Sequence, residues 1–498
     1  MNHRNAPISI VFLGAALGLA ACAVGPDFQR PTPDVPAAWS AKSSSAAVSQ
    51  ANPQAAAEAA WWTSFGDPEL TALIGRAAAA NLDLKQAALR ISQARAQRDA
   101  AASQQLPSLN GNASWAGTAF STTTTQGRLF NQFDKLPNTG PTSAVSFPNP
   151  YGQYQLGFDA SWEVDLFGHV RRGVEAAGAN LEAAAWDQRG AQVSLFGEVA
   201  RAYVDLRGAQ TQRAVTQETI ATLGELLDLA RQRRGAGLSS DIDVSRAAAQ
   251  VTAAQASLPQ IDRQVSADIN QLSRLLDLQP GALRAELETA KATPPAPLVV
   301  PVGLPSDLAR RRPDIQGAEA RLHAAVAQQG VAVAELYPRL MLTAAGGSQS
   351  QDITHLFDWA SRFGTLEPQV QLPIFDAGRR KANVQLEDAR AREAAVDYAK
   401  TVLGALHEVD DALVAYDTEE TRHASLAATV AQNRTAVSLA MDRYRSGVGN
   451  FLDVLDAQRT QQQNELQLAQ SNALVSTDLV ALYKALGGGW DAAAQPAS

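Results

Sequence analysis

The sequence is poor in charge, aromatic side chains, cysteine and long apolar runs. Charged residues make up 18% of the 498 positions, against roughly 25% in an ordinary soluble domain, and aromatic residues make up 6%. The single cysteine excludes an intramolecular disulfide framework and a cysteine-based zinc site. No run of about 18 apolar residues follows the N-terminal region, so we expect no transmembrane helix in the mature chain.

Basic surface and catalytic motifs are also missing. The formal net charge is -8, from 50 acidic and 42 basic residues, whereas a nucleic-acid-binding protein normally presents a basic face. The sequence contains no H-E-x-x-H, G-x-S-x-G or Walker A pattern. Its histidines are scattered along the chain: His3, His169, His323, His355, His407 and His423. We therefore expect no enzyme activity, no metal site and no nucleic-acid partner, and any active transport has to draw its energy from another protein.

The N-terminal region has the pattern of a bacterial lipoprotein signal. Arg4 supplies a positive start, and an apolar segment follows from Ile8 to Ala20. The segment leads to Cys22 through Leu-Ala-Ala, which resembles the lipobox, where cleavage before the cysteine frees it to carry a lipid. Ala23 follows, in place of the aspartate typical of inner-membrane retention, which favours outer-membrane delivery. The alternative is an ordinary signal site with an incidental cysteine. Apart from a covalent lipid such as palmitate on Cys22, we expect no cofactor.

An internal repeat organises the rest of the chain. One block matches at a shift of 231 residues (314 − 83): Asp83, Arg90, Ala94, Gln97 and Pro107 align with Asp314, Arg321, Ala325, Gln328 and Pro338. A later block matches at a shift of 210 (408 − 198): Glu198, Val199, Gly237, Asp243, Val244, Asp268 and Leu272 align with Glu408, Val409, Gly447, Asp453, Val454, Asp478 and Leu482. One unit of roughly 200 residues is thus used twice.

The repeat gives the following division of the chain. We expect a signal peptide at 1–21, a lipidated extended segment at 22–65, a first repeat at 66–292, a Pro-rich linker at 293–305, a second repeat at 306–486 and a flexible tail at 487–498.

Each copy alternates very long helices with short strands. Helices are predicted at 67–105, 169–235 and 240–278 (interrupted at Pro259), and again at 307–336, 379–445 and 450–486, because these segments are rich in good helix formers. A helix of about 65 residues is about 100 Å long. No compact domain needs helices of that length.

Strands are predicted at 107–118, 154–166, 338–348 and 366–374 from alternating polar and apolar residues. The clearest is the second: Tyr154, Leu156, Phe158, Ala160, Trp162, Val164 and Leu166 fall on one face, and Gln155, Gly157, Asp159, Ser161, Glu163 and Asp165 on the other. Such a strand is long enough to cross a bilayer when tilted. The alternative is four half-buried strands of a soluble sheet.

Four strands are too few to close a barrel, and open strand edges in hydrocarbon leave backbone groups unpaired. The chain is therefore expected to associate with copies of itself. Three protomers would supply twelve strands and two would supply eight, and the sequence pattern alone does not prove either.

Several motifs resemble the outer-membrane factor (TolC-like) family, specifically the lipoprotein branch of efflux-pump channels (OprM/NodT-like). They are Val24 to Phe28, Pro36 to Trp39, Trp61 to Leu70, Arg311 to Ile315, Leu372 to Gly378 and Tyr444 to Leu455. The resemblance implies an α+β membrane protein with four transmembrane strands and very long helices per chain. It further implies a homotrimer whose 12-stranded β-barrel is continued by a periplasmic α-helical barrel, closed at its far tip until a pump complex engages it. The implied partners are a periplasmic adaptor, an inner-membrane pump and outer-membrane lipids.

An acidic cluster late in one long helix is a candidate periplasmic gate. It contains Glu408, Asp410 and Asp411. Three-fold symmetry would bring rings of Asp411 together if that face points inward, and acidic rings favour cations. Arg201, which matches Asp411 in the repeat, is a candidate counter-charge from a neighbouring helix. The alternative is a solvated helix face, and the family's acidic constriction favours the gate.

Two glycine-bearing turns join the long helices and are candidate docking tips for the adaptor. They carry Gly237 with Leu238, and Gly447 with Val448. Glycine suits left-handed helix ends, and Ser240 and Asn450 suit the start of the next helix. A turn with no further role is the simpler reading, and the tip position implied by the family favours docking.

The polar strand residues Asp159, Glu163 and Asp165 are expected to line the lumen, although solvated interface positions are the alternative. The insert 119–152 is expected to be a long extracellular loop.

Taken together, the sequence predicts a lipid-anchored, trimeric channel in a Gram-negative outer membrane that conducts small toxic compounds within a tripartite efflux system. The alternatives are the outer-membrane duct of a type I protein secretion system, and a periplasm-spanning scaffold lipoprotein that is not a channel. The scaffold would explain Cys22 and the helices but not the alternating strands.

Overall fold

The computed structural model describes residues 23–32, 35–40, 59–133, 149–294 and 305–490. The helices are η2 (Trp61–Phe65), α2 (Pro68–Ala80), α3 (Leu82–Ser103), α4 (Thr125–Phe133), α5 (His169–Gly235), α6 (Asp241–Leu275), α7 (Arg284–Leu287), α8 (Pro305–Arg311), α9 (Pro313–Ala334), η3 (Ile353–His355), η4 (Trp359–Ser361), α10 (Arg379–Arg445) and α11 (Phe451–Ala485). The strands are β1 (Ser108–Thr118), β2 (Tyr151–Val164), β3 (Arg339–Ser350) and β4 (Arg362–Gln371). None of the described helices has both the length and the apolar composition needed to cross a bilayer.

The chain divides into two compact units. The described residues within 1–29, 94–181 and 322–394 form unit 1, which carries the sheet; those within 30–93, 182–321 and 395–498 form unit 2, which carries most of the helical hairpins. The order α3–β1–β2–α5–α6 recurs as α9–β3–β4–α10–α11. The matched long helices have equal lengths, 67 residues for α5 and α10 and 35 for α6 and α11.

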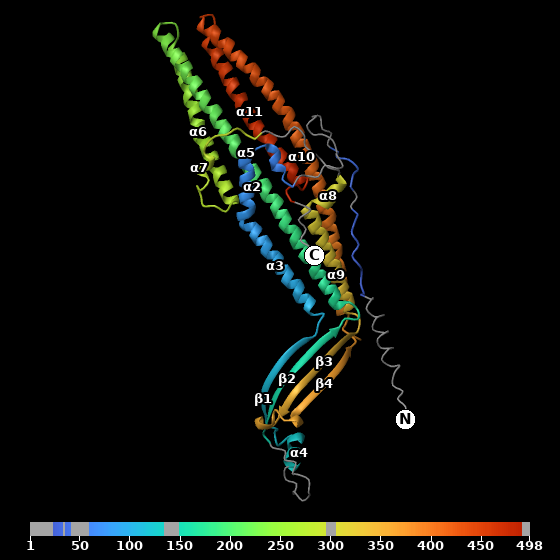
Figure 1. The fold of residues 1–498 in the computed structure, drawn as a ribbon. Coiled ribbons are helices and arrows are strands. Elements are labelled where there is room, and N and C mark those ends of the chain that lie inside the picture. Colours follow the sequence, from blue (N-terminus) through green and yellow to red (C-terminus); the bar gives the residue numbers. More distant parts are fainter. Residues whose placement is uncertain (1–22, 33–34, 41–58, 134–148, 295–304, 491–498) are drawn as a thin grey trace. The chain divides into compact units, whose positions relative to one another are not determined.

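The sheet of unit 1 is antiparallel, with its strands in the order β1-β2-β3-β4 (Figure 1). Register places Trp162 opposite Leu342, and Leu342 opposite Pro368, on one face. The neighbouring positions Ser161 and Thr343 belong to the other face. The predicted period-2 alternation is confirmed.

The apolar face of this sheet is not packed under a core. Leu109 is 69% exposed, Phe158 64% and Leu366 70%. An apolar face left this open in one protomer calls for an apolar surrounding or another chain.

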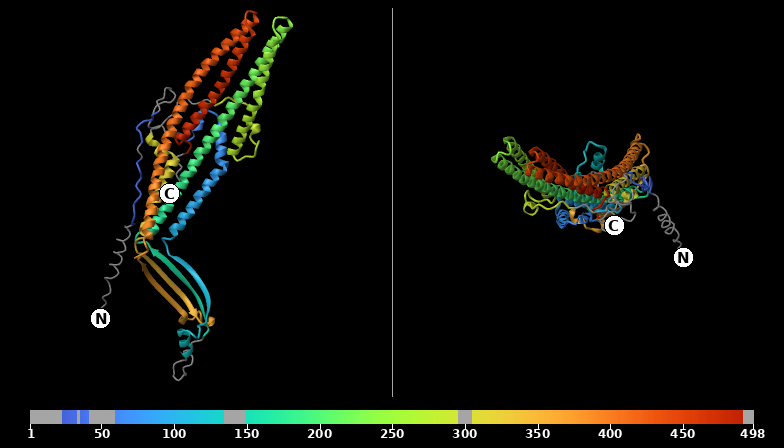
Figure 2. Two further views of the ribbon diagram at one scale, coloured as in Figure 1. Left: turned by 180° about the vertical axis from the view of Figure 1, so that it is seen from behind. Right: turned by 90° about the horizontal axis from the view of Figure 1, so that it is seen from above.

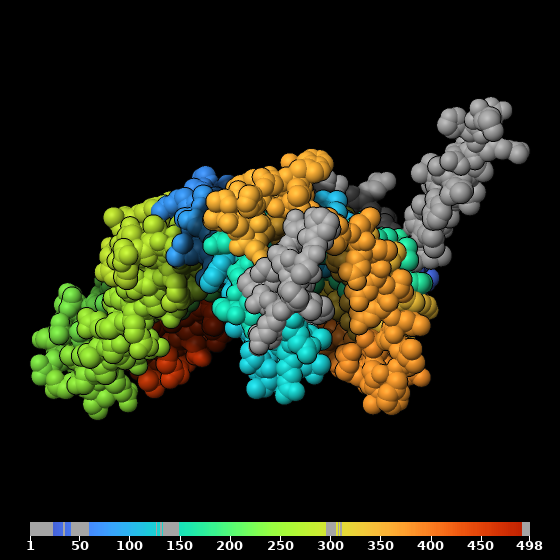
Figure 3. All heavy atoms as spheres, turned by 90° about the horizontal axis from the view of Figure 1, so that it is seen from below, coloured from blue at the N-terminus to red at the C-terminus, as the bar shows by residue number. Residues whose placement is uncertain are grey.

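The β1–β2 and β3–β4 connections lie at the same end of the sheet. Thr118, the last residue of β1, pairs with Tyr151, and Ser350, the last residue of β3, pairs with the nearby Tyr154. Figure 3 shows the cyan β1–β2 connection and an orange part of the β3–β4 hairpin on one face. The insert 119–152, predicted to be a long loop, contains the short helix α4, and its last two positions belong to β2, which begins at Tyr151. Residues 134–148 of the insert lie outside the described residues.

Unit 2 contains most of two helical hairpins, in which α6 lies beside α5 and α11 beside α10 (Figures 1 and 2). Its largest apolar cluster joins η2 and α2 to these long helices. The fully buried members with large side chains include Trp61, Phe65, Leu70, Tyr203, Leu272 and Tyr416. A second cluster near the turns joins both hairpins through Leu226, Ala247, Tyr444 and Val454.

The structure corrects three predicted helix boundaries. The segment 67–105 is two helices, because Asn81 caps α3 through the Leu84 amide and donates its own amide N–H to the Leu275 carbonyl. The segment 307–336 breaks at Arg312, since the residue before Pro313 is disfavoured in the α-helical region. Conversely, α6 runs without a break through Pro259, where packing of a long helix offsets the missing N–H donor.

Candidate functional site

The polar face of the sheet carries two of the three predicted strand carboxylates. Asp159 on β2 accepts hydrogen bonds from the side chains of Asn110 and Asn112 on β1. Glu163, two positions from Ser161 on the same strand and hence on the same face, lies 3.3 Å from the Nδ1 atom of His169. Both carboxylates of the polar face therefore have polar side chains beside them.

Asp165, the third predicted strand carboxylate, does not belong to a strand, because β2 ends at Val164. Its Oδ2 atom accepts from the Arg171 backbone N–H at 2.8 Å, in the first turn of α5. An aspartate at a helix start satisfies an amide that has no partner within the helix. The predicted end of the fourth strand is also too late, because Ile374 lies beyond the end of β4 at Gln371.

The acidic cluster on α10 is split between partners. Glu408 lies 2.6 Å from Arg312, whose side chain is 11% exposed and also contacts Asp314. Asp410 accepts a hydrogen bond from the Ser40 hydroxyl at 2.7 Å. Asp411 is exposed. Because each residue of a helix turns by about 100°, Glu408 and Asp411, three positions apart, lie on the same side of α10, whereas Asp410 points to another side.

Arg201 has a side chain that is 73% exposed, and it lies 3.8 Å from Asp205, one turn further along α5. It also lies close enough to Asp478 on α11 to favour ionisation of that carboxylate. In the single chain, Arg201 is therefore surrounded by α5 and α11 acids rather than by Asp411.

Sequence reasoning missed two acids in unit 2, the buried Asp268 and the half-buried Asp478. Burial raises the pKa of Asp268 to about 6, the Gln264 side chain partly opposes this, and the charge of Asp205 adds to it. Asp268 is 8% exposed, and its Oδ2 atom is buried with no hydrogen-bond partner among the described residues. Burial likewise raises the pKa of Asp478 to about 6, assisted by the charge of Glu419 and opposed by Arg201.

The signal for these acids was present in the repeat alignment, where Asp268 matches Asp478. The alignment could not reveal burial, because apolar and polar positions are mixed around both long helices. Position in the packed hairpins, rather than residue type, sets these two carboxylates apart from the exposed ones.

The two turns of the helical hairpins have the same construction. Gly237 and Gly447 adopt positive φ, +74° and +81°. The amides of Leu238 and Val448 donate back to the carbonyls of Arg233 and Arg443 at 2.8 and 3.1 Å, which closes the helix ends. The following helices are capped by Ser240 and Asn450, as predicted: these side chains accept from the Asp243 and Leu452 backbone amides.

Both tips present apolar side chains to solvent. Leu238 is 69% exposed and Val448 is 71% exposed. A link between the hairpins lies behind them, where the Arg233 guanidinium donates to the Tyr444 carbonyl at 2.6 Å and packs over its ring. The tips are thus exposed ends of a packed structure.

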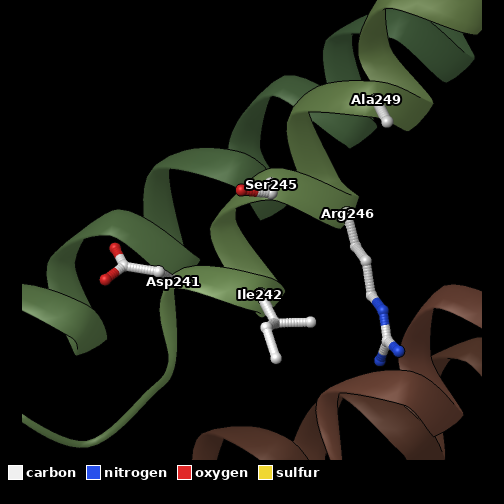
Figure 4. Close-up of a pocket in the computed structure, with 5 residues that line it drawn as sticks. All are labelled: Asp241, Ile242, Ser245, Arg246 and Ala249. Carbon is white, nitrogen blue, oxygen red and sulfur yellow. The ribbon is translucent and has the colours of Figure 1, made fainter.

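A shallow cavity of about 400 Å³ lies along α6 next to the first tip. It is lined by Asp241, Ile242, Ser245, Arg246 and Ala249. In Figure 4 these side chains project from one helix, and Arg246 extends towards a neighbouring helix in the red-brown of the second hairpin. In the second hairpin the aligned positions (a shift of 210) include Leu455 and Arg459 in place of Ser245 and Ala249, so the two tips differ in surface.

The described histidines take part in separate contacts. His323 stacks on Phe28 and lies 3.0 Å from Glu175, while His423 contacts Asn472. Among the residues that the structure describes, no set of three or more His, Cys, Asp or Glu residues is placed to hold a metal ion. Cys22, the predicted lipid site, lies outside the described residues.

The buried aspartates generate a prediction about stability. At neutral pH the folded protein holds Asp268 and Asp478 as carboxylates where burial disfavours charge, whereas in the unfolded chain their pKa is near 3.9. This destabilisation is present above pH 6 and is relieved as the pH falls from about 6 to about 4. D268N and D478N should therefore each raise the free energy of unfolding at pH 7.5 by up to about 1–2 kcal/mol, and so raise Tm. The gain should be smaller at pH 5, and thermal unfolding at both pH values measures it.

D442N, which neutralises an exposed carboxylate on α10, is the matched control. Equal Tm changes at both pH values, or a larger gain at pH 5, would contradict the assignment of raised pKa values to the two aspartates.

Comparisons with known proteins cover nearly the whole chain. The profile of the family described as "Outer membrane efflux protein" matches residues 73–277 and 304–488. Outer membrane protein OprJ of Pseudomonas aeruginosa is 35% identical over 497 residues, covering 98% of this chain and 97% of that protein. Toluene efflux pump outer membrane protein TtgI of Pseudomonas putida is 33% identical over 479 residues, covering 96% of this chain and 97% of that protein.

Solved structures agree. The outer-membrane channel OprN superposes with a TM-score of 0.84 at 33% identity, covering 94% of this chain and all of that one. The open state of the MtrE outer membrane channel of Neisseria gonorrhoeae gives a TM-score of 0.76 at 27% identity, covering 94% of this chain and 99% of that one.

Proposed function

Because this chain belongs to the outer membrane efflux protein family, we propose that it is the exit duct of a tripartite efflux system and passes small toxic compounds out of the cell. The main support for this function is that two features occur in one chain. One is an antiparallel sheet whose apolar face is exposed, and the other is a pair of hairpins, each made of a 67-residue and a 35-residue helix. Three protomers close the sheet into a 12-stranded barrel, which leaves no strand edge in the membrane.

In this assembly the apolar strand face meets lipid and the polar face, with Asp159 and Glu163, lines the lumen. Acidic lumen side chains give a mild preference for cations. The duct has no catalytic role and conducts passively, and an inner-membrane pump supplies the energy through a periplasmic adaptor.

The adaptor docks at the two helical tips. Exposed Leu238 and Val448 offer apolar contact. The cavity along α6 offers a recess lined by groups of both charges, the carboxylate of Asp241 and the guanidinium of Arg246. Apolar contacts surrounded by polar groups are the usual composition of a protein interface.

Deletion of the gene should make the cells sensitive to toxic compounds such as toluene, and the wild-type gene should restore resistance. Replacing both Leu238 and Val448 with aspartate should abolish that rescue while trimers still form, because buried unpaired charges oppose docking. Minimum inhibitory concentrations and native gels measure the two outcomes.

The control is I353D, which places the same charge at an exposed apolar residue of unit 1, 58% exposed. Full rescue by the tip variant would refute adaptor docking at the tips. Unchanged susceptibility after deletion of the gene would refute the efflux function itself.

A lipid on Cys22 anchors the N-terminus at the membrane. The first described residues after it support this, since the Val24 amide donates to the Phe167 carbonyl at 3.0 Å, directly after β2. Ala23 packs against Gly168 so closely that a Cβ atom there would lie 2.8 Å from the Ala23 side chain. Asp27 then pairs with the buried Arg172. The chain next to Cys22 is thus held at the end of a membrane strand.

C22S should lose incorporation of labelled palmitate, because it removes the thiol that carries the lipid. Metabolic labelling followed by outer-membrane fractionation tests this, with wild type as the reference. Labelling that survives in C22S would contradict lipidation at this residue.

Asp410 and Asp411 form the gate, with Arg201 of a neighbouring protomer as counter-charge. The exposure of Asp411 and Arg201 leaves both available to contacts between protomers. Glu408 is assigned a different role, because its ion pair with Arg312 joins α10 to the segment between α8 and α9.

D410N/D411N should increase single-channel conductance in planar bilayers, because it removes charges that bind counter-charged partners at the constriction. E408Q is the control: it should lower Tm and leave conductance unchanged. If D410N/D411N conducts like wild type, these aspartates are not the gate.

A further inference from the structure

A cationic cavity lies in unit 1 where the strands give way to helices. Its volume is about 240 Å³. The lining residues come from the end of α9 and the loop after it, the start of β3, the end of β4 and the start of α10: Glu335, Tyr337, Arg339, Gln371, Pro373, Arg379 and Arg380. Three arginines against one glutamate give the lining an excess of two positive charges.

Two of these arginines are held in place by neighbouring side chains. The Arg339 guanidinium lies 2.8 Å from His169 Nε2 and 3.7 Å from Glu335. Because a guanidinium has no acceptor, His169 accepts through Nε2 and carries its proton on Nδ1, which faces Glu163. Arg380 donates to Asp376 at 3.0 Å.

Arg379 is different, because its side chain forms no ion pair or hydrogen bond with any residue that the structure describes. The turn before it fixes its position: Asp376 accepts from the backbone amides of Gly378 and Arg380 at 3.1 and 3.2 Å. Ala377 adopts φ +53°, a conformation that costs a non-glycine residue energy. The turn therefore holds Arg379 at the first position of α10, beside the cavity.

The start of the long helix in the first repeat also carries arginines, but acids hold them. At the shift of 210 residues that relates α5 to α10, Arg379 matches His169 (379 − 169), and Arg171 and Arg172 lie two and three positions further along α5. Arg171 pairs with Asp165, and Arg172 with Asp27 and Glu175. Glu335, the acid among the lining residues, lies 3.7 Å from Arg339, and Asp376 just before α10 is paired with Arg380.

We propose that this cavity binds an oxyanion, the phosphate or carboxylate group of a small anionic solute inside the duct, with Arg379 and Arg339 as its principal ligands. Guanidinium groups recognise such anions through paired charge-assisted hydrogen bonds. Arg339 pairs with Gln371 in the sheet register and lies two positions from Met341, opposite Glu163, so the site opens on the polar face. The proposal rests on the proposed function only in taking that face as the lumen.

Such a site gives the duct a local preference for anions at the junction. It offsets the acidic side chains Asp159 and Glu163 further along the same face. A negatively charged compound would then meet an attractive position before it enters the strand region.

The test uses the purified full-length trimer in dodecyl maltoside, with inorganic phosphate as the probe and 31P line broadening as the readout. R379Q should weaken phosphate binding by about tenfold, the loss expected for one charge-assisted contact, and R339Q/R379Q should abolish it. K381Q, which removes an exposed charge two residues further along α10 and outside the cavity, should bind within twofold of wild type.

A second arm separates a solute from a lipid headgroup. Phosphatidylglycerol retained by the trimer in native mass spectrometry should be the same in wild type and R379Q. Loss of phosphatidylglycerol in R379Q, equal phosphate binding by wild type and R379Q, or an equal loss in K381Q would each overturn the proposal. Phosphate binding is measured on the purified trimer, whereas efflux is measured in cells. A negative result for phosphate binding therefore does not refute the efflux function, and a negative result for efflux does not refute phosphate binding.

Discussion

A sheet with two open edges cannot lie in hydrocarbon, because each unpaired backbone N–H or C=O group there costs several kcal/mol. This chain supplies four antiparallel strands with an exposed apolar face and with β1 and β4 as edges. Association into a closed barrel satisfies the edges and the apolar face at once. The roles of the polar strand face and of the repeated helices both depend on that closure.

The internal repeat supplies the elements of this closed assembly twice within each chain. Each copy delivers one strand hairpin and one helical hairpin, with long helices of 67 and 35 residues in both. The copies are not interchangeable, since equivalent positions carry different chemistry. The first position of the long helix is His169 in α5 and Arg379 in α10, and the cavity beside Ser245 has Leu455 and Arg459 at the aligned positions of the second hairpin. Differences of this kind allow repeated elements to acquire separate roles.

Periodicity predicted the strands, the paired long helices and the glycine turns, because local patterns decide these features. It failed where a single tertiary contact decides the outcome. Asn81 ends α2 through a bond to Leu275, Glu408 pairs with Arg312 rather than joining Asp411, and Asp165 caps α5 instead of extending β2. The raised pKa of Asp268 and the cavity beside Arg379 depend on burial and on neighbours far apart in sequence, which no single-sequence pattern records.

The most direct measurement of the central claim is a scan of spin labels along β2 in trimers reconstituted into lipid bilayers, with the native cysteine replaced. Labels at Leu156, Phe158 and Ala160 should collide with oxygen dissolved in lipid, and labels at Gln155, Asp159 and Ser161 should collide with a water-soluble nickel reagent. That alternation at every second residue is the predicted result. Equal access of the water-soluble reagent to both sets would contradict a membrane barrel built from this sheet.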